Sequence, residues 1–169
     1  MLGDNRIYTL KDVREVYRFL SIRSLQTWVK RGVIIPVQPA SGRGSIVGFE
    51  YLNLIEIGLV MQLVNFGFDR YRLLKRIMGA AHSGKIPWMG NKLGFDGLFT
   101  INEDDLFSPR THEWPDRELF GFQPRDVARE YIMANLNSHN TTGLIIVDVF
   151  AIKEHVDKMI RNYLIQKGK

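Results

Sequence analysis

The chain has 169 residues, of which 45% are hydrophobic and 24% charged, a composition typical of one globular domain or two small ones. It contains no cysteine, which excludes disulfides, cysteine nucleophiles, iron–sulfur clusters and cysteine zinc sites. Residues 1–79 carry 12 basic and 6 acidic residues, whereas residues 80–169 carry 11 and 12. This asymmetry predicts a polyanion-binding first half joined to a nearly neutral second half, although surface Lys and Arg can also serve solubility alone.

The N-terminal residues predict two short helices with almost no connector. Thr9 can cap a first amphipathic helix, whose apolar residues recur at helical spacing. Ser21 can cap a second helix, and Gly32 provides its C-terminal stop. The apolar stripe of the second helix contains Leu25 and Trp28, so Trp28 is expected to be structural. The two helices together indicate a helix-turn-helix.

A β-hairpin, a core helix and a fourth helix are expected next. Two short β runs, residues 33–38 and 46–49, flank a glycine-rich tip. Residues 50–66 are apolar nearly all round, which predicts a helix buried on most faces and ended by Gly67. Asp69 can cap a fourth helix, whose expected solvent side is basic: Arg70, Arg72, Lys75 and Arg76.

The glycine-rich residues 80–97 predict a boundary, with a first domain at 1–79 and a second at 80–169. In the second domain we expect a strand near 98–101, irregular chain to 123 and a helix at about 124–136. A buried strand at 144–147 and a last helix at about 150–165 follow. The predicted fold class is α+β: a helix-helix-hairpin-helix-helix unit followed by a small mixed α/β domain that ends in a strand and a helix.

One face of the second predicted helix is wholly polar. Arg23, Gln26, Thr27 and Lys30 fall at positions i, i+3, i+4 and i+7, opposite the apolar stripe. Arg pairs with guanine, Gln with adenine, Thr contacts a thymine methyl or a phosphate, and Lys neutralises a phosphate. The other interpretation is an ordinary solvated helix face, but the second helix of a helix-turn-helix is the one that enters the major groove.

Three further arginines are candidates for DNA contact. Arg43 lies between Gly42 and Gly44 at the tip of the expected hairpin, where the glycines permit close approach to a phosphate or a minor groove. An ordinary surface loop is the alternative. Arg14, Arg18 or the basic residues of the fourth helix are expected near the DNA backbone.

Several short motifs follow one another in a characteristic order: Tyr8-Thr9-Leu10-Lys11-Asp12-Val13, Ser21-x-Arg23-Ser24-Leu25-x-x-Trp28, Arg31-Gly32-Val33-Ile34-x-Pro36, Gly42-Arg43 and Gly67-Phe68. In this order and spacing, residues 7–78 resemble the DNA-binding domain of the MerR family of bacterial transcription regulators. The resemblance implies a winged helix-turn-helix that binds promoter DNA as a dimer. It places Arg23, Ser24 and Thr27 on the recognition helix and Arg43 on the wing.

The chain departs from the family pattern in two places. Residues 17–20 stand where the family has a glycine-containing turn, and Ile46 or Val47 where the wing often has a tyrosine. The long dimerising helix of the family would fall on the glycine-rich residues 80–97, so a homodimer must be built differently.

We expect no enzymatic activity, cofactor or metal, because the four histidines are dispersed and no catalytic motif is present. No membrane segment is expected, and a cytoplasmic location is predicted. The predicted partners are double-stranded DNA, a second copy of the chain and a small-molecule or protein effector at the C-terminal domain. The alternatives are an antitoxin or adaptor that binds another protein, and a phage architectural protein of the excisionase type.

Overall fold

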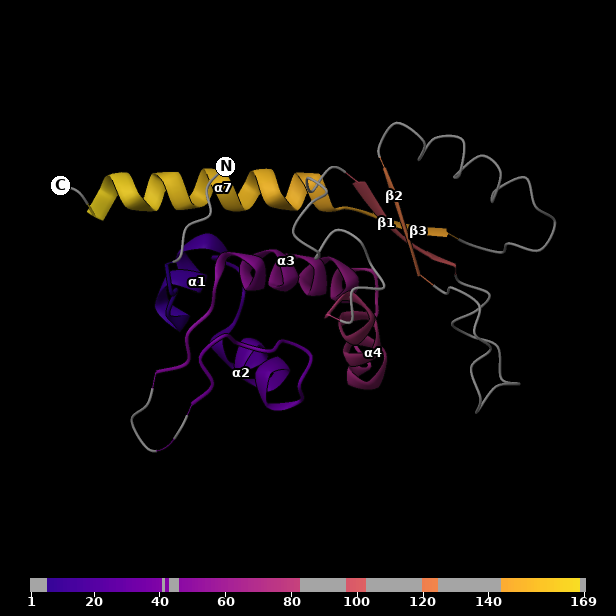
Figure 1. Cartoon of the computed structure of the whole chain (residues 1–169), viewed down its shortest axis with the longest axis horizontal. Coiled ribbons are helices and arrows are strands. Elements are labelled where there is room, and N and C mark those ends of the chain that lie inside the picture. Colours follow the sequence, from indigo (N-terminus) through magenta and orange to yellow (C-terminus); the bar gives the residue numbers. More distant parts are fainter. Residues whose placement is uncertain are drawn as a thin grey trace.

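The structure, a computed structural model, describes residues 6–40, 42, 46–82, 97–102, 120–124 and 144–167. Within these ranges, α3 lies between α7 on one side and α2 and α4 on the other, and the strands lie at one end of the helices (Figure 1). None of the helices described is long and apolar enough to cross a membrane. The elements in chain order are α1 (Leu10–Val16), α2 (Ile22–Lys30), α3 (Tyr51–Asn65), α4 (Tyr71–His82), β1 (Gly97–Asn102), β2 (Phe120–Pro124), β3 (Leu144–Asp148) and α7 (Val149–Lys167).

The first two helices begin at the capping residues expected from the sequence. The Thr9 hydroxyl accepts from the Asp12 amide at 3.3 Å, and the Asp12 carboxylate accepts from the Thr9 amide at 2.8 Å, which forms a capping box. The Ser21 hydroxyl accepts from the Ser24 amide at 3.0 Å. Trp28 is only 6% exposed, which confirms its structural role.

The connection between α1 and α2 needs no glycine. Tyr17 and Leu20 are buried, the Leu20 amide donates to the Tyr17 carbonyl at 3.0 Å, and Arg18 and Phe19 point outward. The turn is therefore fixed by burial of Tyr17 and Leu20, while the two residues between them face solvent.

The predicted hairpin is much shorter than the sequence indicates. The runs 33–38 and 46–49 meet at one antiparallel bridge between Gln38 and Gly48, and the next residue, Phe49, pairs with Tyr8 instead. The amides of residues 33 and 34 both donate to the Trp28 carbonyl and close the end of α2. Because Pro36 also lacks an amide hydrogen, half of the first run has no donor left for a strand ladder. Of the tip, the structure describes residues 39, 40 and 42.

α3 is buried on most sides, as its apolar sequence predicts, and Gly58 is the point of closest approach. A Cβ atom at Gly58 would lie 2.5 Å from Ile152 Cγ2 and 2.5 Å from the Tyr17 hydroxyl oxygen. The Tyr17 hydroxyl donates to the Leu54 carbonyl at 2.7 Å. The missing side chain thus lets both α7 and the end of α1 reach α3.

The three strands form an antiparallel sheet in the order β2-β1-β3, with Phe99 opposite both Phe122 and Val147. The strands predicted near 98–101 and 144–147 are confirmed. The irregular chain expected up to Gln123 is wrong for residues 120–123, which belong to β2. Gly121 and Pro124 give β2 a weak strand propensity, so pairing with β1 decides its conformation. A helix was expected at 124–136. Pro124 instead belongs to β2, and residues 125–136 lie outside the described ranges.

The last helix, predicted at 150–165, is confirmed as α7. α7 packs against α1, α3 and β1, and its apolar residues join the core of the N-terminal helices: Val149, Ile152, Val156 and Ile160. Tyr163 donates to Asp12, and Tyr51 donates to Asp157 at 2.7 Å, so polar contacts accompany the apolar ones. The division at residues 79 and 80 stays a prediction, but one hydrophobic core extends across it.

Candidate nucleic-acid interface

The exposed face of α2 is the one that the sequence predicts. Arg23, Gln26 and Lys30 extend into solvent, whereas Leu25 and Trp28 on the opposite side are buried. Arg23 and Lys30 are seven residues apart, which separates them by about 10 Å along the helix axis. That distance spans roughly three base pairs of a DNA duplex.

The two hydroxyl residues of α2 are engaged within the helix. The Thr27 hydroxyl donates to the Arg23 carbonyl at 2.7 Å, and the Ser24 and Ser21 hydroxyl oxygens lie 2.8 Å apart. Both Ser24 and Thr27 are half-buried. Arg23, Gln26 and Lys30 are therefore the α2 side chains best placed to meet a ligand from solvent.

The C-terminal end of α2 lies against the start of α4. The guanidinium of Arg31, the C-cap residue, lies 5.6 Å from the centre of the Tyr71 ring, a cation–π contact. A Cβ atom at Gly32, where φ is +67°, would lie 3.5 Å from the Lys75 amino nitrogen. These two contacts bring the basic side of α4 next to α2.

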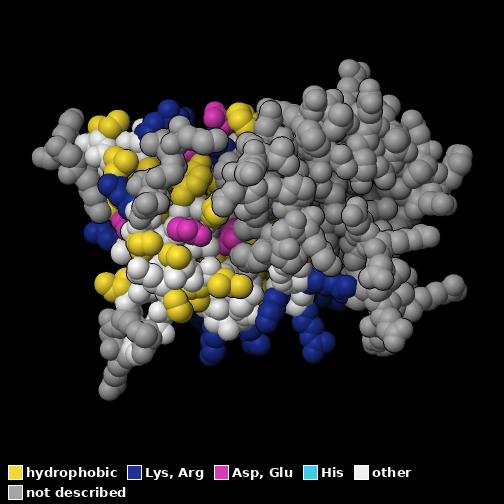
Figure 2. Space-filling model, viewed as in Figure 1, with side chains coloured by type: hydrophobic (Ala, Val, Ile, Leu, Met, Phe, Trp, Pro, Cys, Tyr) yellow, Lys and Arg dark blue, Asp and Glu magenta, His cyan; other side chains and the backbone are white. Residues whose placement is uncertain are grey.

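Together the two helices form one positively charged surface, here called the α2–α4 surface. Figure 2 shows Lys and Arg side chains gathered along the lower edge of the molecule, below these helices. All of the basic members are exposed: Arg23, Lys30, Arg31, Arg70, Arg72, Lys75 and Arg76. Desolvation by neighbouring atoms lowers the pKa of Arg76, but an arginine stays charged at neutral pH.

Few acids balance these charges. Asp69 is the one acidic residue within residues 17–40 and 66–82. Elsewhere in the described chain, Glu50 caps α3 and Glu56 is buried. The other acidic residues lie on α1 or at the start of α7 and within it: Asp12, Glu15, Asp148, Glu154 and Asp157. Unbalanced basic side chains on one face give that face a positive potential, which attracts polyanions.

The remaining candidates fall elsewhere. Arg14 is exposed on α1, and Arg18 borders a pocket with Met159 and Asn162 of α7 rather than extending the α2–α4 surface. Arg43 lies outside the described residues. Arg31 was not among the residues predicted for the site, although the sequence carries a signal for it: the basic pair Lys30-Arg31 precedes the helix stop at Gly32.

No group of three His, Cys, Asp or Glu side chains in the described ranges could hold a metal ion. Three consecutive acidic residues that could bind a metal, Glu103, Asp104 and Asp105, lie outside those ranges. Comparison of the chain with models of protein families and with curated proteins finds no match. The geometry of the α2–α4 surface therefore carries the functional argument alone.

Proposed function

We propose that this protein binds double-stranded DNA through the α2–α4 surface and regulates transcription as a MerR-like winged helix-turn-helix protein. The observation that supports the proposal is that the exposed face of α2 continues into the basic side of α4 through Arg31 and Lys75. A helix fits the major groove, and cations on both sides of that groove can neutralise phosphates.

In the proposed complex, α2 lies in the major groove. Arg23 and Gln26 can read base edges, because both are exposed and lie in the first half and at the middle of α2. Lys30, Arg31 and Lys75 at the other end contact the phosphate backbone. The chain between Gln38 and Gly48, which the single bridge brings together, would be the wing and would carry Arg43.

The proposal includes a homodimer in the cytoplasm that binds two half-sites. Sedimentation measures the oligomeric state separately. A protein that is monomeric at concentrations where it binds operator DNA would recognise one half-site only.

DNA binding is tested by fluorescence anisotropy with duplexes from the promoter region of the protein's own gene and with random duplexes over a range of salt. The logarithm of the binding constant should fall with the logarithm of the salt concentration by roughly 0.9 for each phosphate contact. Lys30→Ala and Lys75→Ala should each flatten this slope by about one unit. Lys158→Ala is the charge-matched control, because Lys158 is exposed on α7, across α3 from α2.

Arg23→Ala separates base reading from phosphate contact. If Arg23 reads a base, its loss should cost about 1–3 kcal/mol on the operator and leave binding to random duplexes nearly unchanged. Equal losses on both duplexes would assign Arg23 to the backbone. A wild-type protein with no affinity for any duplex at low salt would refute the proposal and favour the protein-interaction function of an antitoxin or adaptor.

A further inference from the structure

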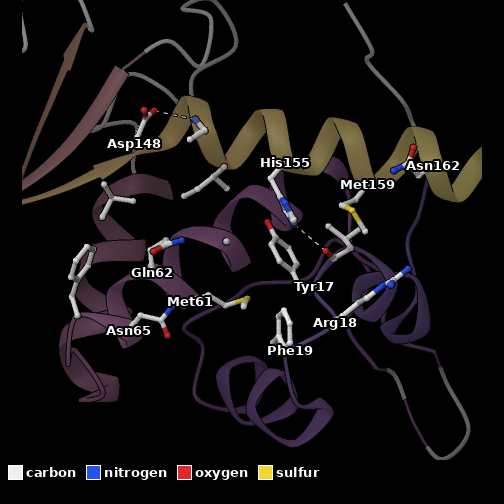
Figure 3. A pocket seen from close by; sticks show the side chains of 16 residues that line it. Tyr17, Arg18, Phe19, Met61, Gln62, Asn65, Asp148, His155, Met159 and Asn162 are labelled. Carbon is white, nitrogen blue, oxygen red and sulfur yellow. Dashed lines mark hydrogen bonds between the residues drawn. The ribbon is translucent and has the colours of Figure 1, made fainter.

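A pocket lies beneath α7, on the other side of the helical core from α2. It is an open pocket, lined by the connection between α1 and α2, by α3 and by α7 (Figure 3). Its volume is about 810 Å³, within the range of roughly 300–1,000 Å³ found for small-molecule sites. Much of its wall is apolar: Met61, Phe66, Ile152 and Met159.

Two aromatic side chains at this pocket are left open to water. Phe19 is 99% exposed although Tyr17 and Leu20 beside it are buried, and Phe66 is 53% exposed. An apolar occupant that covers either ring removes apolar surface from water. Flat ligands suit such a site, because aromatic rings and methionine sulfur both pack well against aromatic faces.

The polar groups divide between the two ends of the pocket. Figure 3 places Arg18 and Asn162 at one end, and Asp148 at the other. The Asp148 carboxylate accepts from the Ala151 amide at 3.0 Å, so it caps α7. Within the described chain, the side chains of Arg18 and Asn162 have no hydrogen-bond partner or ion pair. The end of the pocket that carries Arg18 is thus available to a ligand, and Glu15 lines an adjoining hollow with the same two side chains.

Two side chains in the middle of the pocket wall, Tyr17 and His155, are held in place by contacts with their neighbours. The His155 ring stacks on Tyr17 with 5.6 Å between the ring centres, and His155 Nε2 lies 3.1 Å from the Val16 carbonyl oxygen. These contacts join α7 to the end of α1 above Gly58. The wall is therefore built by the packing of the core and does not depend on a ligand.

We propose that this pocket binds a small organic anion with a flat apolar body. The anionic group contacts Arg18 and Asn162, and the body lies against Phe19, Met61 and Met159. Such a ligand also contacts the connection that leads to Ser21, the N-cap of α2. Its binding would then change the affinity for DNA. This regulatory consequence rests on the proposed DNA binding, but the ligand site itself is independent of that proposal.

The site is tested by calorimetry on the full chain without DNA, with 2-naphthoate, 2-naphthyl phosphate and the uncharged 2-naphthamide as probes. Both anions should bind more tightly than the amide. Arg18→Gln should weaken anion binding about tenfold, because it removes a charge-assisted hydrogen bond, and leave binding of the amide unchanged. Arg14→Gln is the matched control, since Arg14 is exposed one helical turn earlier and outside the pocket.

Two further variants test the apolar part. Phe19→Ala should weaken all three probes, whereas Ile46→Ala should not, because Ile46 is also exposed but lies outside the pocket wall. Ala151→Trp should block the pocket and abolish binding. The proposal is overturned if the wild type binds none of the probes, or if binding survives both Arg18→Gln and Ala151→Trp.

The regulatory consequence is measured separately, as the affinity for duplex DNA with and without 2-naphthoate. A change in affinity that Arg18→Gln removes would support it, since coupling between two sites is reciprocal. If the probes bind and DNA affinity stays the same, the ligand site stands and the regulation is refuted. If no duplex binds at all, the proposed function fails while the calorimetry still decides the ligand site.

Discussion

At the scale of single residues, Gly58 determines how closely the helices pack. Alanine normally stabilises a helix relative to glycine. At Gly58 the added Cβ would lie 2.5 Å from a branched side chain, Ile152, and 2.5 Å from the Tyr17 hydroxyl, which is hydrogen-bonded. Neither neighbour can move cheaply, so the clash outweighs the gain in propensity.

We therefore expect Gly58→Ala to lower the free energy of unfolding by about 1–3 kcal/mol, the usual cost of overpacking a core. Gly79→Ala is the matched control, because Gly79 is exposed on α4 with nothing within 4 Å of the added Cβ. The control should be neutral or slightly stabilising. Urea denaturation measures both, and equal stability of the two variants would contradict the close packing at Gly58.

Trp28 is the second residue with a clear structural role. Its ring is buried under α2, and its carbonyl accepts from the amides of Val33 and Ile34. Trp28→Ala should cost roughly 3–5 kcal/mol, as expected for a buried aromatic residue. Thermal unfolding followed by circular dichroism measures the loss, and an unchanged melting temperature would show that the ring is not part of the core.

At the scale of elements, α7 is the helix whose packing only the structure shows. Its apolar residues belong to the core of α1 and α3, so deleting residues 144–169 would remove core side chains along with any dimer contact. Loss of self-association after that deletion would not identify a dimer interface. Point substitutions on α7 separate docking from association.

Tyr163→Phe tests the docking of α7 on α1. Tyr163 donates to Asp12, whose carboxylate also belongs to the capping box of α1. A hydrogen bond to a charged acceptor contributes about 1.5–3 kcal/mol, so the variant should lose up to this amount of stability. Tyr71→Phe, at an exposed position on α4, is the control and should change little. Equal unfolding midpoints in guanidinium chloride for the two variants would mean that Tyr163 does not hold α7.

At the scale of the whole molecule, alkaline pH should destabilise the protein through two tyrosines at the junction of α1, α3 and α7. Burial raises the pKa of Tyr17, and the charge of Tyr51 adds to this effect, while a backbone hydrogen bond at Gly58 opposes it. Burial and the hydrogen bond to Asp157 raise the pKa of Tyr51. The ordinary pKa of tyrosine is about 10.

Because the fold favours the protonated form of both side chains, their stabilisation is fully present below about pH 10 and is lost as the pH rises above it. Denaturation at a series of pH values between 8 and 12 should show this fall. Tyr17→Phe should lower stability at pH 8, since it loses the bond to the Leu54 carbonyl, but should make the alkaline fall shallower. An unchanged slope in the variant would assign the alkaline loss to other groups.

Local patterns in the sequence are sufficient to predict most of the helices. The caps at Thr9 and Ser21, the glycine stop at Gly32 and the spacing of apolar residues all act over a few residues, so they predict α1, α2, α3 and α7. The same periodicity places Arg23, Gln26 and Lys30 on the exposed face of α2. These features depend on neighbours in the chain, which a sequence displays directly.

Contacts between distant residues required the tertiary structure. The pairing of β2 with β1 overrides a weak strand propensity, and the closure of α2 by Val33 and Ile34 shortens the expected hairpin. The packing of α7 on α3 forms the pocket, and the turn at Gly32 brings Lys75 to the end of α2. Sequence periodicity determines which side of a helix is apolar, but the helix that covers this side depends on the packing of the whole core.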